Sequence, residues 1–439
     1  MSIFFGTDGL RGIIGDDLNH EIAYNCGNAL GKIAPNSNIL LGKDTRVSGD
    51  YISTAFASGL ISAGCNITIV GVCPTPAVAY LTHSLGYDYG VSITASHNPL
   101  DHNGIKIFDN NFRKITDKKE ELIEKNFFRH ILTSNENLGQ ITYKSELVAN
   151  YEKFLRKNLK NINNLKIIFD CANGATSPIV ENIFSEYRDN VIIINSDKSG
   201  LSINKDCGAT CLDSIKSAMI EHKADIGFAF DGDGDRVIAI DKSGNVIDGD
   251  QIIYILTKYY ISTGKLRKKE VVGTSHTNMG MEMGLNKMGV ILHRAEIGDK
   301  YVASKLVEKD LQIGGEQSGH IIQRDLLPTG DGILTAITLI NIIIENECNL
   351  INLCTYTPYK QCNINVKVNN KLNIINNSTL SSTLEEKQDT LKDNGRIMIR
   401  VSGTEPVIRI MVESDDYEKS KTIAEQLEII IRKIDKELN

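Results

Sequence analysis

The sequence predicts an α/β protein of several domains that ends in a smaller α+β domain. Its 439 residues exceed what a single hydrophobic core usually covers. Short β-branched runs alternate with segments of helical length, which indicates βαβ units. We therefore expect α/β domains at 1–145, 146–245 and 246–358, and an α+β domain at 359–439.

Strand-like runs and one apolar stripe support this division. A helix is expected from about Glu418, because apolar side chains recur there at three- and four-residue spacing, at Ile423, Leu427, Ile430, Ile434 and Leu438. The longest apolar run, Gly332 to Ile344, is shorter than the roughly 18 residues of a membrane helix, so we expect a core helix and no membrane partner. The predicted strands are 39–41, 67–70, 166–169, 225–230, 271–274, 363–368, 396–401 and 407–412.

Composition excludes several classes of protein. A formal net charge of -7 without a local cluster of Lys and Arg argues against a nucleic-acid partner. The first residues contain Asp8 and no basic stretch before an apolar segment, so we expect no secretory signal and a cytoplasmic protein. Nine scattered cysteines indicate reduced thiols, and the close pair Cys207 and Cys211 lacks the second pair of a zinc site.

The segment from Thr94 to Pro99, Thr-Ala-Ser-His-Asn-Pro, is the first that carries chemistry. Ser96 beside His97 could accept a phosphoryl group on an exposed turn if a cation offsets the charge. Shortly after, Gly104 would permit an unusual backbone angle, and Lys106 could reach the same phosphate or transfer a proton. Taken alone, the serine segment could also be a capped turn.

Asp231, Asp233 and Asp235 alternate with glycine and are followed by Arg236. Three carboxylates at this spacing repel one another unless a cation collects them, and oxygen-only ligands suit Mg²⁺. An EF-hand calcium loop is excluded because Lys242 stands at the twelfth position counted from Asp231, where that loop needs Glu. The alternative is a solvated acidic hairpin.

A glycine-flanked segment at 314–320 offers the side chains of Glu316, Ser318 and His320. Carboxylate, hydroxyl and imidazole groups suit sugar hydroxyls, so we assign these residues, with Arg236, to substrate binding. A tight structural turn is the alternative.

A second polar segment lies near the C-terminus. Two guanidinium groups, two hydroxyls and a glycine gather there, which predicts a phosphate cradle. A plain hairpin turn is the alternative. The cradle residues are Arg400, Ser402, Gly403, Thr404 and Arg409.

Three basic residues near the N-terminus could act on the moving phosphoryl group. Arg11 offers a fixed positive fork that would stabilise developing charge, and Lys43 and Arg46 could reinforce it. Taken alone, each of them is more typical of an ordinary surface charge.

Taken together and in this order, these segments resemble the α-D-phosphohexomutase superfamily over the range from Gly6 to Arg409. Gln317, Gly403, residues 170–175 and Asn204 with Cys207-Gly208 resemble the branch that acts on glucosamine phosphates. The chain departs from the usual pattern at His102, where the superfamily has Asp. It also has Ala209 where that branch commonly has Ser.

The resemblance implies four domains around a central cleft and interconversion of glucosamine 6-phosphate and glucosamine 1-phosphate, toward UDP-N-acetylglucosamine. It implies a phosphorylated Ser96, and one Mg²⁺ held by Asp231, Asp233, Asp235 and the serine phosphate. Glucosamine 1,6-bisphosphate or glucose 1,6-bisphosphate would be the phosphorylating intermediate, with Lys106 or His97 as the base. The partner would be a small hexosamine phosphate. Whether the chain forms a homodimer stays an open question.

Two other functions remain compatible with these residues. A phosphomannomutase or phosphoglucomutase would use the same chemistry on another sugar. A catalytically silent protein could bind sugar phosphates, although it would have no need of both Ser96 and the three aspartates.

Overall fold

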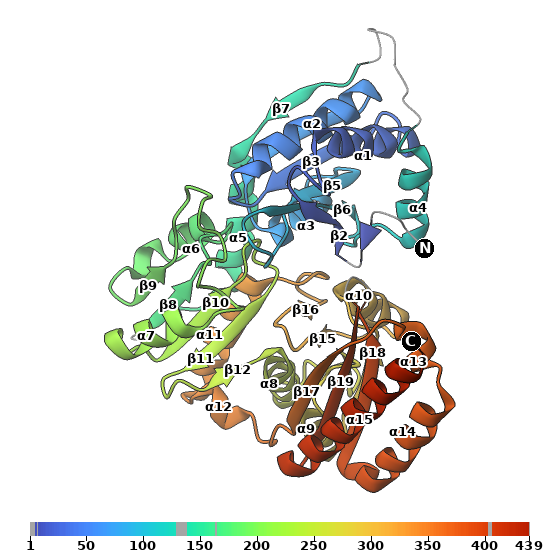
Figure 1. The fold of residues 1–439 in the computed structure, drawn as a ribbon. Helices are drawn as coiled ribbons and strands as arrows, with labels where there is room; N and C mark the ends of the chain where they lie inside the picture. The colour runs from blue at the N-terminus through green and yellow to red at the C-terminus, as the bar shows by residue number, and fades with distance from the viewer. Residues whose placement is uncertain (1–4, 7, 129–137, 163–164, 403–405, 439) are drawn as a thin grey trace. The chain divides into compact units, whose positions relative to one another are not determined.

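The chain folds into two compact units in the computed structural model, which describes residues 5–6, 8–128, 138–162, 165–402 and 406–438. The first unit comprises 1–276 and 290–354 and contains three sheets, and the second comprises 277–289 and 355–439 and contains one sheet (Figure 1). The predicted α/β class with a smaller α+β end is confirmed.

The first sheet has seven strands in the order β1-β2-β6-β5-β3-β4-β7. Its centre is parallel, because β3 pairs in parallel with both β4 and β5, whereas β6 runs antiparallel between β2 and β5. This register sets Arg11 opposite Gly104 on one side of β6 and Ser92 opposite Lys106 on the other. The strands are β1 (Phe5–Gly6), β2 (Gly9–Ile13), β3 (Asn38–Lys43), β4 (Asn66–Val72), β5 (Tyr89–Ile93), β6 (His102–Asp109) and β7 (Ile141–Tyr143), and the helices are α1 (His20–Ile33), α2 (Ser48–Ser62), α3 (Thr75–Ser84) and α4 (Asp117–Asn126).

The second sheet has the order β12-β11-β10-β8-β9. Strand β8 pairs in parallel with β9 and β10, and β10 returns antiparallel as β11, so the three aspartates occupy the β10–β11 hairpin. Phe169 on β8 stacks on Phe230 at the end of β10, with ring centroids 5.9 Å apart. The elements are α5 (Val148–Asn158), β8 (Ile167–Asp170), α6 (Ser177–Ile183), β9 (Val191–Ile194), α7 (Asp213–His222), β10 (Ile226–Phe230), β11 (Val237–Asp241) and β12 (Val246–Ile247), with short 3-10 helices at Ser145–Leu147 and Ser185–Tyr187.

The third sheet has the order β14-β13-β15-β16. Strand β15 pairs in parallel with β13 and antiparallel with β16, so residues 316–320 form the turn of the β15–β16 hairpin. The run from Gly332 is a buried core helix, α11, as predicted. The elements are α8 (Gly249–Ser262), β13 (Glu270–Thr274), β14 (Ile291–Ala295), α10 (Asp299–Glu308), β15 (Ile313–Gly315), β16 (Ile321–Gln323), α11 (Gly332–Asn346) and α12 (Leu350–Leu353).

The second unit is a three-stranded antiparallel sheet, β17-β19-β18, with helices. Its core contains Ile423, Leu427 and Ile434 of the predicted stripe together with Ile431. Leu438 is exposed instead, because it caps the helix beyond the last packed turn. The elements are α9 (Met279–Lys287), β17 (Lys360–Lys367), α13 (Lys371–Ile375), α14 (Ser378–Leu391), a 3-10 helix (Lys392–Asn394), β18 (Gly395–Val401), β19 (Val407–Ser414) and α15 (Tyr417–Glu437).

Candidate active site

Ser96 lies three residues after the end of β5 and is fully buried, so the prediction of an exposed position is wrong for this residue. Its backbone has φ of 53°, in the left-handed region that few residues other than glycine adopt. Its hydroxyl donates to an Asp231 carboxylate oxygen at 2.6 Å and lies 3.2 Å from His97 Nδ1. The turn predicted to carry a phosphoryl group is therefore hydrogen-bonded directly to residues 231–235, the loop of the three aspartates, which we call the aspartate loop.

Asp231, Asp233 and Asp235 are buried, and one ligand oxygen from each lies within 4.8 Å of the others. They are not a solvated acidic hairpin. Burial and the carboxylates of Asp235 and Asp233 raise the pKa of Asp231 well above its ordinary value. Within the described residues, Asp233 Oδ1 and Asp235 Oδ1 have no hydrogen-bond partner. Buried carboxylate oxygens at this spacing that accept no hydrogen bond fit a hard divalent cation such as Mg²⁺.

Lys106 on β6 holds two of these carboxylates. Its ammonium group lies 2.8 Å from Asp233 Oδ2 and 2.8 Å from Asp235 Oδ2. Although burial opposes the charge, Asp233 and Asp235 raise the pKa of Lys106. The departure at His102 does not disturb this geometry, because the His102 side chain pairs with Asp101 at 2.7 Å instead.

His97 differs from Lys106 in its electrostatic surroundings. Burial, with the nearby cations Arg236 and Arg11, lowers the pKa of His97 to about 4. A neutral imidazole close to the Ser96 hydroxyl is able to accept a proton. Of the two bases predicted from sequence, His97 is thus the neutral one, although its lowered pKa also makes it a weak base.

Arg11 and Arg236 flank the aspartates. Arg11 donates to Asn98 Oδ1 at 3.2 Å and pairs with Asp8, and the Arg236 Nε lies 3.8 Å from Asp235 Oδ1. Within the described residues, the buried Nε atom of each guanidinium group has no hydrogen-bond acceptor. Both side chains therefore keep a donor available for an anion.

The contacts of Lys43 and Arg46 do not support the hypothesis that they reinforce Arg11, and burial of Arg46 also makes the surface-charge alternative wrong for that residue. Lys43 pairs with Asp50 on α2. Arg46 is buried and donates to Asp44 and to main-chain carbonyl groups around Ser96, so its guanidinium is already used. The expectation for Gly104 is also wrong, because it has no positive φ. A Cβ there would lie 2.6 Å from the carbonyl oxygens of Leu10 and Thr94, so close packing of main chains requires the glycine.

The residues assigned to sugar binding, Glu316, Ser318 and His320, lie in the turn of the β15–β16 hairpin. Glu316 Oε1 accepts from the amide of Gly298 at 3.1 Å, and Ser318 is exposed. His320 is buried between two carboxylates, with 3.7 Å from Nδ1 to Asp235 Oδ1 and 3.7 Å from Nε2 to Asp299 Oδ2. His320 thus links the aspartate loop to the first residue of α10.

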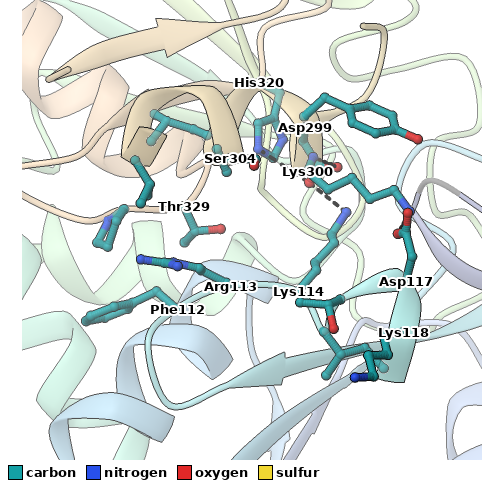
Figure 2. Close-up of a pocket in the computed structure, with 17 residues that line it drawn as sticks. Phe112, Arg113, Lys114, Asp117, Lys118, Asp299, Lys300, Ser304, His320 and Thr329 are labelled. Atoms are coloured by element: carbon teal, nitrogen blue, oxygen red, sulfur yellow. Dashed lines mark hydrogen bonds and ion pairs between the residues drawn. The ribbon is translucent and has the colours of Figure 1, made fainter. Parts of the chain in front are cut away.

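A cavity of about 420 Å³ adjoins His320 (Figure 2). Asp299 and Lys114 line it, with their charged atoms 2.6 Å apart, and Lys300 pairs with Asp117 at 2.7 Å. Although burial opposes ionisation, Lys114 and His320 lower the pKa of Asp299 to about 2. The wall beside the aspartate loop is therefore lined by charged groups.

The phosphate-loop residues belong to the second unit, which is described by itself. Arg400 on β18 stands directly opposite Arg409 on β19, and burial with the neighbouring Arg409 charge lowers the pKa of Arg400. Ser402 is buried, and its amide donates to the Val407 carbonyl at 2.9 Å. Gly403 and Thr404 lie outside the described residues.

Sequence reasoning missed several residues that contact this site. Thr75 donates to Asp233 Oδ2 at 2.6 Å. Thr94 belongs to the predicted serine segment, but the sequence did not indicate that its hydroxyl donates to Asp44, also at 2.6 Å. Lys114 and Asp299 form part of no recognised motif. Only the position of Asp299, at the start of α10 and shortly after β14, could have indicated it, because ligand-binding side chains gather beyond strand ends.

Models of the phosphoglucomutase/phosphomannomutase family match the chain in four successive domains. The α/β/α domain I model matches residues 2–133, domain II 143–244, domain III 248–359, and the C-terminal domain model 364–430.

Curated relatives and solved structures are similar over nearly the whole length. A phosphoglucosamine mutase from Pseudoalteromonas atlantica is 40% identical over 98% of both chains, and one from Clostridium acetobutylicum is 39% identical over 99% of both. A phosphoglucomutase/phosphomannomutase family protein from Burkholderia thailandensis superposes with a TM-score of 0.84 at 22% identity, covering 98% of this chain and 97% of that one. Aspergillus fumigatus N-acetylphosphoglucosamine mutase, in complex with GlcNAc-6P and magnesium, superposes with a TM-score of 0.71 at 17% identity, covering 99% of this chain and 96% of that one. Among the described residues, no helix is long and apolar enough to cross a bilayer.

Proposed function

The chain belongs to the phosphoglucomutase/phosphomannomutase family, and from this membership we propose that it is a phosphoglucosamine mutase, an isomerase that interconverts glucosamine 6-phosphate and glucosamine 1-phosphate. The observation that carries the chemistry is the 2.6 Å hydrogen bond from Ser96 to Asp231, within a buried triad of carboxylates. The names of the relatives at 37% to 40% identity support the choice of sugar.

Ser96 carries the transferred group. In the active enzyme its oxygen is phosphorylated, and attack by a sugar hydroxyl on that phosphorus breaks the Ser96 O–P bond while a sugar O–P bond forms. The hydroxyl proton passes to a base, and the candidate is His97, whose Nδ1 lies 3.2 Å from the Ser96 hydroxyl. The resulting glucosamine 1,6-bisphosphate reorients within the site and returns its other phosphoryl group to Ser96. Glucose 1,6-bisphosphate is the alternative phosphorylating intermediate.

The surrounding side chains bind and orient the substrate. Asp231, Asp233 and Asp235, with the serine phosphate, would hold one Mg²⁺, which when bound offsets the charge of the moving phosphoryl group. Arg11 and Arg236 direct their unused donors to phosphate oxygens. Glu316, Ser318 and His320 contact the sugar, and Arg400, Ser402, Gly403, Thr404 and Arg409 bind the phosphate that is not reacting.

The test compares initial rates with glucosamine 6-phosphate, glucose 1-phosphate and mannose 1-phosphate, using magnesium-loaded protein phosphorylated on Ser96. Preference for glucosamine by about tenfold or more, equal to about 1.4 kcal/mol of transition-state discrimination, supports the proposal and a role toward UDP-N-acetylglucosamine. Preference for another sugar makes the protein a phosphoglucomutase or phosphomannomutase. Turnover by Ser96→Ala at the wild-type rate contradicts the mechanism.

A further inference from the structure

Both main-chain polar groups of Ser96 are bound by side chains. Its amide donates to Thr94 Oγ1 at 2.9 Å. Its carbonyl oxygen accepts from Asn204 Nδ2 at 2.8 Å and from Arg46 Nη2 at 3.2 Å. Because a non-glycine residue at φ of 53° is in a sparsely populated conformation, surrounding contacts are needed to keep it there.

Arg46 is a fully buried cation with a fixed orientation. Its Nε donates to Asp44 Oδ2 at 3.0 Å, which neutralises the charge. Its two terminal nitrogens donate to the carbonyl groups of Asn98 at 2.7 Å and His102 at 3.0 Å, in addition to Ser96 and Pro99. Only a planar guanidinium with five donors can satisfy this set of acceptors, and a lysine ammonium cannot.

Asn204 reaches the same turn from the segment between β9 and α7, in the second sheet's domain. Its side-chain amide donates to the Asn98 carbonyl at 3.2 Å as well as to Ser96. Its main-chain amide donates to the Ala172 carbonyl at 2.9 Å. Gly232 lies so near that a Cβ there would be 2.7 Å from the Ser96 oxygen and 2.9 Å from Asn204 Nδ2. The aspartate loop thus covers this contact.

We infer that Arg46 and Asn204 are positioning residues that hold the Ser96 turn in the conformation in which its hydroxyl faces Asp231. Neither side chain touches the hydroxyl itself. If the two carbonyl contacts are lost, the peptide relaxes to the commoner negative φ, and the Cβ and Oγ atoms move away from the carboxylates. The inference rests on the proposed function, because it concerns the residue that carries the phosphoryl group.

The decisive variant is Asn204→Asp. It has nearly the same shape, but it sets a carboxylate oxygen against two carbonyl oxygens, so it repels the turn that Asn204 binds. We expect kcat with glucosamine 6-phosphate to fall by about tenfold to a hundredfold, the usual range for residues that orient a metal site. KM should change by less than about twofold, because ground-state binding is untouched.

Three further variants accompany it. Asn204→Ala removes the donor without repulsion, so its loss of kcat should be smaller. Arg46→Lys keeps a positive charge beside Asp44 but not the fork, and it should remain impaired. The matched control is Asn195→Ala, since Asn195 also has a positive φ in the same domain but donates to Ser214 at 2.9 Å. Its activity should stay within about twofold of wild type.

Hydrogen exchange separates positioning from general stability. In Asn204→Asp, amides of a peptide spanning residues 94–103 should exchange faster than any fall in the thermal midpoint accounts for, whereas exchange elsewhere stays at wild-type values. Faster exchange throughout the protein, or a fall of kcat only in step with the thermal midpoint, overturns the inference. A wild-type kcat in Arg46→Lys overturns the role of the guanidinium fork.

The two proposals can fail separately. If wild-type protein does not isomerise glucosamine 6-phosphate, the proposed function fails, and the exchange experiment still decides whether the turn is held. If wild type is active and Asn204→Asp keeps kcat within about threefold, the positioning inference fails while the function stands.

Discussion

The Ser96 hydroxyl lies 2.6 Å from an Asp231 carboxylate oxygen, although the two residues come from different sheets. Ser96 follows β5 of the first sheet, and Asp231 follows β10 of the second. A phosphoryl group on this oxygen would lie directly against the carboxylates, where a divalent cation is required to offset the charge.

Asp231→Asn should therefore impair turnover and magnesium dependence together. The substitution keeps the shape but removes one negative charge from the buried triad. We expect initial rates at saturating substrate to fall by roughly a hundredfold, and half-maximal activity to require more magnesium. Asp189→Asn, an exposed carboxylate in the same domain, is the control. An unchanged magnesium requirement in Asp231→Asn would contradict the assignment.

Magnesium alone should raise the thermal midpoint of the wild-type protein. Three buried carboxylates with two unpartnered oxygens repel one another, and a cation that binds only the folded state stabilises it. At about a hundred times its dissociation constant, the expected gain is about 2.7 kcal/mol. Differential scanning fluorimetry with and without magnesium measures it. An equal rise in Asp231→Asn would place the bound cation at another site.

Local pattern predicted eight of the nineteen strands of the described residues, together with the segments that carry chemistry. The run before Asp231 is a buried strand, β10, and the glycine-spaced aspartates form the hairpin after it. Such features can be predicted because short runs of apolar residues, bounded by turn-forming residues, can be recognised directly in the sequence. The stripe on α15 was predicted for the same reason.

Contacts between distant segments could not be predicted in this way. Arg46 has the sequence context of a surface cation, and only the fold reveals that main-chain carbonyl groups surround it. Lys114 and Asp299 pair across two domains and have no characteristic spacing. Gly104 was assigned an unusual backbone angle, whereas the neighbouring strand β2 leaves no room for a side chain.

Gly104→Ala should lower both stability and activity. A Cβ would lie 2.6 Å from the Leu10 and Thr94 carbonyl oxygens and 2.9 Å from Arg11 Cγ. Because three segments of the first sheet would have to separate, we expect a loss of about 1–3 kcal/mol. Thermal unfolding measures the loss, and Gly86→Ala serves to separate backbone strain from crowding, because Gly86 has φ of 73° but open space around its Cβ position. An unchanged midpoint for Gly104→Ala would show that the strands can separate freely.

Arg400→Ala should weaken phosphate binding while relieving repulsion. Arg400 and Arg409 are directly opposite on adjacent strands, and like charges in such pairs destabilise a sheet. We expect KM for the sugar phosphate to rise about tenfold or more, as loss of a charge-assisted contact implies. Inorganic phosphate should raise the thermal midpoint of wild type more than that of the variant. Equal effects of phosphate on both proteins would argue against an anion site here.

Asp331 should make stability fall as the pH rises, in a window below neutrality. Its carboxylate accepts from the Leu334 amide at 2.9 Å and from the Tyr151 hydroxyl at 2.9 Å. Burial nevertheless raises its pKa to about 6, against about 3.9 in an unfolded chain. Between these values the folded protein binds more protons than the unfolded one, so stability decreases with rising pH, by at most about 3 kcal/mol.

Asp331→Asn removes this titration but keeps an oxygen to cap α11, and its amide can donate to the Tyr151 hydroxyl oxygen. The midpoint difference between variant and wild type should therefore move in favour of the variant as pH rises from about 4 to about 7. Scanning calorimetry at several pH values measures this difference, with Asp189→Asn as the exposed control. A difference that does not change with pH would mean that the Asp331 carboxyl titrates alike in both states, and burial would then not be the dominant influence on its charge.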